Sequence, residues 1–231
     1  MLSDADLLDR LSTNWWFGSL PHEERQAVLA RCEPVEIDTQ QMLCHRGDPA
    51  TSGFYGVVSG RLKASTVRGD GKEAILSLIE PGTWFGQMSM ITGLPRDHDI
   101  TALEPSSVLV INADGFESLM QRNAFARAIA LLQSMHTHWL YLALEDATLH
   151  STRARIARRL ATLAHGGMGA TQIDRREIPV SQEALAMMLG VSRQTLALEL
   201  KAMEQKGAVA LRYGHIEIVS HDILRTFESY A

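Results

Sequence analysis

The sequence contains very little cysteine: its 231 residues include only Cys32 and Cys44. Two thiols are too few for a disulfide scaffold, and an iron–sulfur cluster held by cysteine needs about four. The composition therefore excludes a disulfide-stapled fold and predicts no iron–sulfur cluster.

Long hydrophobic runs and a basic amino terminus are also missing. No stretch of about 18 uncharged apolar residues occurs, so we expect no membrane-spanning helix and no membrane partner. The first residues include Asp4, Asp6 and Asp9 without an early basic run, which is unlike a secretory signal. We expect a soluble, cytoplasmic protein.

Motifs of catalysis do not stand out either. The sequence shows no cysteine–histidine or serine–histidine set, no metal-binding motif and no Walker loop. We therefore expect no enzymatic activity, no catalytic residue and no metal site.

Positive charge is scarce in the chain as a whole but not in its last third. The formal net charge is −5. Residues 1–150 carry 11 Lys and Arg against 19 Asp and Glu, a balance of −8, whereas residues 151–231 carry 11 against 8, a balance of +3. Within 151–213 the count is 10 against 5. This asymmetry favours nucleic-acid binding by the carboxy-terminal part and another role for the acidic front part.

The carboxy-terminal part contains the most informative stretch, residues 181–204. Ser181 and Ser192 are good N-caps for two short helices whose apolar residues recur at helical spacing. Gly190 permits a tight turn between them. The pattern predicts a helix-turn-helix of the DNA-reading kind, and the alternative is an ordinary helical hairpin with a polar face.

Two neighbouring features favour DNA reading over the plain hairpin. Short apolar runs at 208–211 and 216–219, with a turn at Gly214, predict a two-stranded wing. Four arginines crowd a helix upstream, where they could meet phosphates. They are Arg153, Arg155, Arg158 and Arg159.

The front part shows helical segments around 4–11 and 22–31 with an aromatic cluster at 15–17. From Glu33 the hydrophobic period changes to two. Short β-branched and apolar runs then alternate with glycine- and proline-containing turns about ten residues apart. This spacing predicts a small antiparallel barrel or roll.

In combination these features resemble the family of the cyclic-AMP receptor protein and the fumarate–nitrate reductase regulator, the Crp/Fnr family, over essentially the whole chain. The motifs that carry the resemblance are Gly47-Asp48-Pro49-Ala50, Ser59-Gly60-Arg61-Leu62, Pro81-Gly82-Thr83-Trp84-Phe85-Gly86 and the helix-turn-helix with its wing.

The resemblance implies an α+β fold in three parts. These are an N-terminal antiparallel β-roll effector domain of the cyclic-nucleotide-binding kind over 1–121, a long dimerisation helix over 122–150, and a C-terminal winged helix-turn-helix DNA-binding domain over 151–231. It also implies a homodimeric bacterial transcription regulator. Its expected partners are double-stranded DNA with a palindromic operator, a second copy of the chain, and RNA polymerase.

In that family, the segment after the Phe-Gly pair and a later arginine cradle the effector's phosphate. The matching residues, which we expect in the effector pocket, are Gly86, Gln87, Met88, Ser89, Arg96 and Asp97. Gln87 replaces a glutamate that accepts from the ribose. Asp97 replaces a serine that donates to the phosphate, and a carboxylate there would repel the anion. We therefore expect a site that is not an ordinary cyclic-AMP site. An Arg96 paired with Asp97 or Asp99 at a surface or dimer interface stays an open alternative.

The effector itself is left unidentified. A cyclic nucleotide or another small molecule would suit the resemblance. Cys44, His45 and His98 are candidate haem ligands, but haem is disfavoured, because the nine histidines of the chain are scattered along the sequence.

The segment 123–149 carries apolar residues at alternating spacings of three and four, a coiled-coil seam of nearly four heptads. We expect one apolar stripe to face a partner helix and another to face the β-roll. The residues that we expect at the dimer interface are Phe125, Leu132, Met135, Trp139 and Leu142.

The start of the second helix of the helix-turn-helix carries the expected base contacts. Arg193 matches an arginine of the family that holds guanine, and Gln194 suits adenine. Leu198 stands where the cyclic-AMP receptor protein has a second base-reading arginine. The residues that we expect at the DNA are Ser181, Gln182, Ser192, Arg193, Gln194, Thr195 and Lys201.

One rival hypothesis remains open. Because β-rolls of this kind occur outside transcription factors, the chain could be a ligand-binding regulatory protein that acts on a protein partner rather than on DNA. The basic, winged carboxy-terminal part favours DNA.

Overall fold

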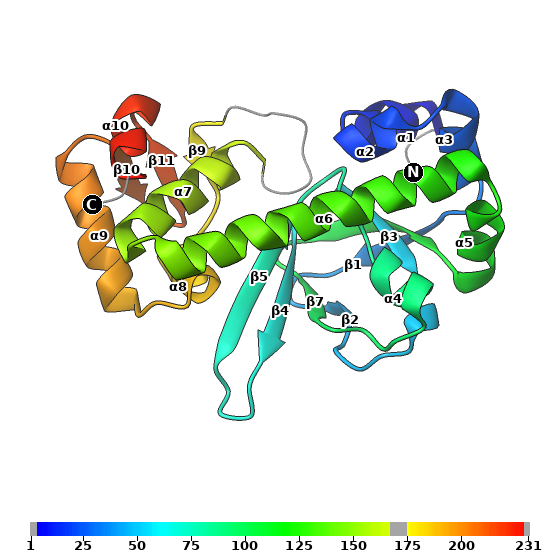
Figure 1. Cartoon of the computed structure of the whole chain (residues 1–231), viewed down its shortest axis with the longest axis horizontal. Coiled ribbons are helices and arrows are strands. Elements are labelled where there is room, and N and C mark those ends of the chain that lie inside the picture. The colour runs from blue at the N-terminus through cyan, green and yellow to red at the C-terminus, as the bar shows by residue number, and fades with distance from the viewer. Residues whose placement is uncertain (1–3, 167–174, 229–231) are drawn as a thin grey trace. The chain divides into compact units, whose positions relative to one another are not determined.

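A computed structural model describes residues 4–166 and 175–228 of the chain (Figure 1). Within these ranges the chain divides into two compact units. One contains residues 4–66 and 76–138, and the other contains residues 67–75, 139–166 and 175–228. No helix in the described part is both long and apolar enough to cross a bilayer.

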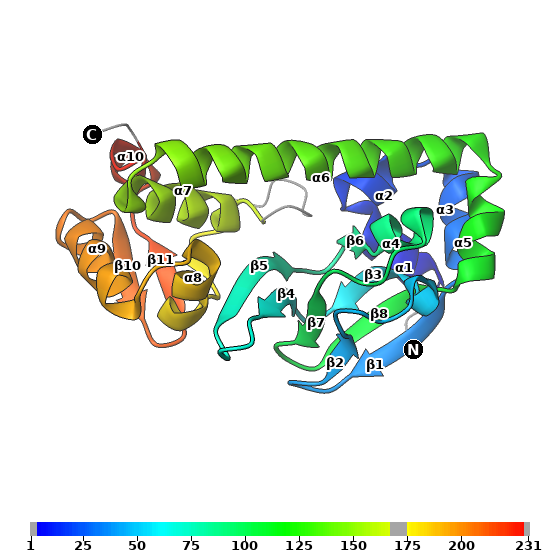
Figure 2. The same cartoon turned by 60° about the horizontal axis from the view of Figure 1, so that its bottom comes forward.

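The front part of the chain forms two four-stranded sheets with the strand orders β1-β8-β3-β6 and β2-β7-β4-β5 (Figure 2). The strands are β1 Glu33–Ile37, β2 Met42–Cys44, β3 Phe54–Ser59, β4 Leu62–Val67, β5 Glu73–Ile79, β6 Trp84–Phe85, β7 Asp99–Ala102 and β8 Ser106–Ile111. Pairing is antiparallel, with Val57 opposite Val108 and Ala64 opposite Ile100. The predicted antiparallel roll is therefore confirmed.

Alternation along the central strand β3 builds two separate cores. Val57 belongs to a cluster that draws residues from both sheets, including Leu62 and Ile100. Phe54 and Val58 lie on the other face and join an aromatic cluster. Successive side chains of a strand point to opposite faces, so a strand buried on both sides reads as a continuous apolar run.

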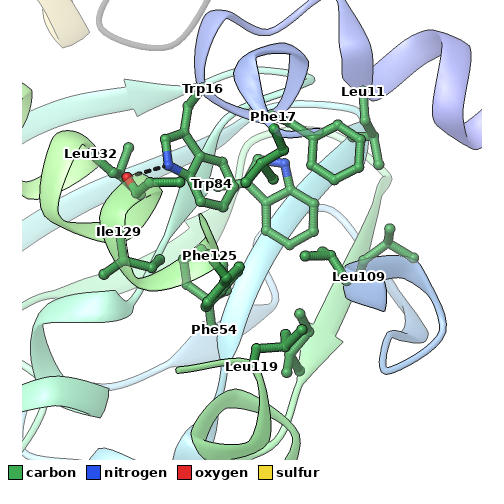
Figure 3. Close-up of a cluster of buried hydrophobic side chains, with 14 of the residues drawn as sticks. Leu11, Trp16, Phe17, Phe54, Trp84, Leu109, Leu119, Phe125, Ile129 and Leu132 are labelled. Carbon is green, nitrogen blue, oxygen red and sulfur yellow. Dashed lines mark hydrogen bonds between the residues drawn. The ribbon is translucent and has the colours of Figure 1, made fainter. Parts of the chain in front are cut away.

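Helices cover the aromatic side of the roll (Figure 3). They are α1 Asp4–Ser12, α2 Trp15–Ser19, α3 His22–Leu29, α4 Gln87–Thr92, α5 Ala113–Met120 and the first half of α6 Asn123–Leu149. Asn14 caps α2, because its side-chain oxygen accepts from the N–H groups of Trp16 and Phe17. The indole N–H of Trp16 donates to the carbonyl of Ala128 at 2.7 Å. The aromatic cluster seen in the sequence is thus the core that ties the amino-terminal helices to α6.

Helix α6 changes from buried to exposed along its length. Its buried residues are Phe125, Ala128, Ile129 and Leu132. Phe125 and Leu132, predicted at the dimer interface, lie in the aromatic core of their own chain with 0% and 3% exposure. That part of the prediction is wrong, because the same helical period serves both packing against the roll and pairing with a second helix.

The second unit contains the carboxy-terminal helices and a three-stranded sheet of order β10-β11-β9. Its elements are α7 Thr152–Ala164, β9 Glu177–Ile178, α8 Gln182–Leu189, α9 Arg193–Gln205, β10 Val209–Arg212, β11 His215–Ile218 and α10 His221–Thr226. Helices α8 and α9 form the predicted helix-turn-helix, and β10 and β11 form the predicted wing beside α9 (Figure 2). The predicted fold class is therefore confirmed.

Candidate nucleic-acid interface and effector site

Local capping sets the geometry of the helix-turn-helix. Ser181 accepts the N–H of Ala184 at 3.1 Å and so begins α8. Ser192 accepts the N–H of Thr195 at 3.0 Å and begins α9. Gly190 has a φ of 67°, a left-handed conformation that glycine adopts without a Cβ clash. The start of α9 is therefore presented at the end of a tight, well-capped turn.

Helix α9 has one buried and one exposed side. Leu196, Leu200 and Met203 are fully buried. Arg193 has a side chain that is 72% exposed and forms a long ion pair with Glu183, at 3.6 Å. An ion pair this exposed contributes little to stability, so the guanidinium is free to exchange Glu183 for another acceptor.

The other predicted DNA contacts lie around the same helix starts, except Lys201, which lies further along α9. Ser181, Ser192, Gln194, Thr195 and Lys201 are exposed, and Gln182 is half-buried. The hydroxyls of Ser192 and Thr195 lie 2.8 Å apart. Hydroxyls and free N–H groups at helix starts are suited to phosphate oxygens.

Three of the four α7 arginines that the sequence suggested could meet phosphates make contacts within their own chain. Arg153 pairs with Glu199 of α9 at 2.5 Å, and Arg155 donates to the carbonyl of Leu189 at 2.6 Å. Arg158 pairs with Asp146 at 2.6 Å. These side chains hold α7 to its neighbours, so much of the local basic charge is structural.

In the first unit, Arg96 is 7% exposed. Its guanidinium donates to the carbonyl of Gly86 at 3.0 Å and to the carbonyl of Gly53, and it lies over the ring of Tyr55 at 5.3 Å. Arg96 is therefore not a surface arginine, as one form of the alternative had it. Arg96 is committed to main-chain carbonyls and an aromatic face.

Gly86 is required at this place for two reasons. Its φ is 98°, and a Cβ would lie 2.8 Å from the carbonyl oxygen of Gly53 and 2.9 Å from Nη1 of Arg96. Any larger residue would push apart the Gly53–Arg96–Gly86 arrangement.

The remaining predicted effector residues divide by exposure. Gln87 and Ser89 are each 3% exposed, whereas Met88 is 41% exposed and Asp97 is exposed. Met88 and Asp97 therefore lie on the outer side of the segments that bury Gln87, Ser89 and Arg96.

Gln87 links α4 to α6. Its side-chain nitrogen donates to Oε1 of Gln133 at 3.1 Å and lies 2.9 Å from Nδ1 of His136. Burial lowers the pKa of His136 below its ordinary 6.5. The neutral ring can accept the amide proton at Nδ1, whereas a protonated ring would present a second donor there.

Two segments of the chain match models of known protein domains. Residues 34–123 match the cyclic nucleotide-binding domain, and residues 154–227 match the Crp-like helix-turn-helix domain. The chain belongs to the Crp/Fnr family of transcription regulators.

Relatives of this family align over most of the chain. The cyclic AMP receptor protein of Thermus thermophilus is 27% identical over 203 residues, covering 87% of this chain and 91% of that protein. The cAMP-activated global transcriptional regulator of Pasteurella multocida is 27% identical over 189 residues, covering 79% and 88%. The structure of FixK2 from Bradyrhizobium japonicum shares the fold with a TM-score of 0.75 at 16% identity, covering 87% and 98%.

Several contacts of this Crp/Fnr-family chain were missed in the sequence. Tyr55 and Gly53 complete the surroundings of Arg96 from β3 and the turn before it, and His136 reaches Gln87 from α6. These partners lie more than 40 residues away along the chain, so no local pattern could reveal them. Glu183, which pairs with Arg193, could have been inferred from the predicted hairpin of helices.

The candidate haem ligands have contrasting surroundings. Cys44 is 3% exposed, and burial raises the pKa of its thiol to about 11. His45 lies 3.7 Å from Asp48 at the surface, and His98 is half-buried. A buried, protonated thiol is a poor ligand for haem iron.

Proposed function

We propose that this Crp/Fnr-family regulator is a bacterial homodimer that binds a palindromic operator through α9 and receives a signal at its β-roll. The tasks divide among residues 1–121 for the signal, 122–150 for dimerisation and 151–231 for DNA. By the same family resemblance, RNA polymerase is a further partner.

The exposed, polar start of α9 is the observation that carries DNA reading. Arg193 can hold guanine O6 and N7 with two hydrogen bonds, and Gln194 can do the same for adenine N6 and N7. The residues assigned to phosphates are Ser181, Gln182, Ser192, Thr195 and Lys201.

The second half of α6 supports the dimer. Its large apolar side chains are exposed in the single chain, which favours cover by another molecule. They are Leu140, Tyr141, Leu142, Leu144 and Leu149, between 40% and 68% exposed.

One stripe on α6 has the spacing of a coiled-coil seam. Its members recur at alternating steps of four and three and are Leu131, Met135, His138, Leu142, Glu145 and Leu149. Met135 and Leu142 of the original prediction fall on this stripe, and Trp139 lies beside it and is half-buried. A two-fold pair held here would present two copies of α9 to a two-fold DNA site.

Replacement of Leu142 by Lys tests the seam. We expect Leu142→Lys to give monomers in sedimentation and to weaken operator binding by at least about 100-fold, because one half-site then binds without its tethered partner. Leu94→Lys is the control, since Leu94 is a 62% exposed leucine that lies outside α6. A dimeric Leu142→Lys protein would refute this seam.

The signal at the β-roll is proposed to differ from an ordinary cyclic-AMP site. Arg96 already donates to two carbonyls, and the carboxylate of Asp97 adjoins it in sequence. The names of the Thermus thermophilus and Pasteurella multocida relatives refer to cyclic AMP, so this nucleotide is the direct test. Cyclic AMP at about 100 times its Kd would add about 2.7 kcal/mol of stability. We expect no rise in melting temperature with cyclic AMP or cyclic GMP. A clear rise would refute this part alone.

DNA binding is tested by selecting a duplex from random sequence and measuring its affinity against a scrambled duplex over a range of salt. We expect at least about a thousandfold preference and a steep salt dependence, because phosphate contacts release counterions. Equal affinity for both duplexes would overturn operator reading and favour a regulatory protein that acts on a protein partner.

A further inference from the structure

The outer side of α9 is a stripe of four exposed side chains. Gln194, Leu198, Lys201 and Gln205 recur at steps of four, three and four, opposite the buried Leu196, Leu200 and Met203. Three members of this stripe are polar or charged. Leu198 is the exception, and it is 71% exposed.

Leu198 is not part of the hydrophobic core of its own domain, and most of its apolar side chain is exposed to solvent. The neighbouring Ala197 is exposed too, which makes a small apolar area between Gln194 and Lys201. Arg193 and Lys201 frame this area with positive charge. Charged residues are depleted at the centre of protein–protein interfaces. A small apolar area bordered by two cations is therefore better suited to contact base edges in the DNA major groove than to contact an apolar protein surface.

In the major groove, one base feature matches an aliphatic side chain, the C5-methyl group of thymine. A leucine side chain makes no hydrogen bonds. Against another base, it would remove water from the donors and acceptors of that base without replacing their hydrogen bonds. Leu198 would therefore favour thymine by contact and disfavour the other bases by desolvation.

We propose that Leu198, flanked by Ala197, is a specificity-determining residue that reads a thymine methyl group in each half-site of the operator. The proposal rests on the proposed function. Leu198 lies four residues beyond Gln194, about 6 Å along the helix axis. That distance is close to two base-pair steps of about 3.4 Å. The thymine therefore lies within two base pairs of the adenine that Gln194 holds.

The test removes the methyl group alone. After selection of an operator with the full-length protein, each thymine of a half-site is replaced singly by deoxyuridine. We expect one position at which the wild-type protein loses about fourfold in affinity, the contribution of one buried methyl group. For Leu198→Ala, the same replacement should cost less than about 1.5-fold.

Two further variants complete the experiment. Leu198→Arg should shift the selected base at that position from thymine towards guanine, because arginine bonds guanine O6 and N7. Val219→Ala is the matched control, since Val219 is a 49% exposed apolar residue of the same unit outside α9. It should keep the deoxyuridine effect unchanged. All three variants should keep the wild-type melting temperature, because both side chains are exposed.

The outcomes separate the two proposals. If the wild-type protein selects no sequence at all, the proposed function fails. If it selects an operator but tolerates deoxyuridine everywhere, or if Leu198→Ala shows the same penalty as the wild type, the assignment of Leu198 is wrong and operator reading stands.

Discussion

Two arginines show how differently the two halves of the molecule use the same side chain. Arg96 is almost fully buried, donates to the carbonyls of Gly53 and Gly86 and lies over Tyr55. Arg193 is 72% exposed and, among the residues that the structure describes, pairs only with Glu183 at 3.6 Å. The first arginine is part of the fold, and the second is available to a ligand. Residue type alone therefore does not identify a binding site, whereas the satisfaction of its donors does.

Removal of Arg96 should have the largest effect on this comparison. We expect Arg96→Met to lower the free energy of unfolding by about 2–4 kcal/mol, because it takes the guanidinium donors from two main-chain carbonyls. Urea unfolding measures this. Arg68→Met is the control, with a 72% exposed side chain and an expected change within about 0.5 kcal/mol. Equal free energies of unfolding for Arg96→Met and the wild type would show that the contacts of Arg96 do not stabilise the fold.

Removal of Arg193 should affect binding and leave stability alone. We expect Arg193→Ala to lose about 1–3 kcal/mol of operator binding and to relax the preference at one guanine. Affinity measured on operators with each base at that position checks this. The same loss on random DNA would mean that Arg193 only holds phosphate.

Replacement of Lys201 sharpens the contrast within the recognition helix. Lys201→Ala should weaken operator and random DNA alike and reduce the slope of log affinity against log salt by about 0.9, the amount for one phosphate contact. Lys206→Ala, an exposed lysine just past the end of α9, is the control. A loss confined to the operator would instead make Lys201 a base contact.

His136 provides the smallest expected effect, in the front half. Its folded-state pKa is lowered by burial, so between the ordinary 6.5 and the lower folded value the unfolded chain binds the extra proton. Stability that is present above pH 6.5 should therefore fall as the pH decreases, by at most about 1.4 kcal/mol per pH unit.

Denaturant unfolding of His136→Gln from pH 7.5 to 5 checks this, with His22→Gln, at an exposed position of α3, as control. The slope with pH should become shallower in His136→Gln alone. Identical slopes for the two variants would show that the link between Gln87 and His136 does not depend on a neutral ring.

Local signals allowed much of the fold to be predicted. The caps at Ser181 and Ser192 and the turn at Gly190 act within a few residues, so the sequence suffices to place the helix-turn-helix. Likewise, the period of two from Glu33 onward is a property of neighbouring residues, and it revealed the roll.

The errors arose where a residue's role depends on distant partners. The period of α6 fits two stripes, and only the aromatic core shows that Phe125 and Leu132 belong to the inner one. The sequence likewise did not indicate that Arg153 pairs with Glu199 and Arg158 with Asp146. Charge counts cannot separate structural arginines from available ones.

Helix α7 contacts three other helices of the carboxy-terminal unit. Arg153 forms an ion pair with Glu199 of α9, and Arg158 forms one with Asp146 near the end of α6. Arg155 donates to the carbonyl of Leu189, the last residue of α8. Through these contacts, α7 links the helix-turn-helix to the last turns of α6 within the same unit.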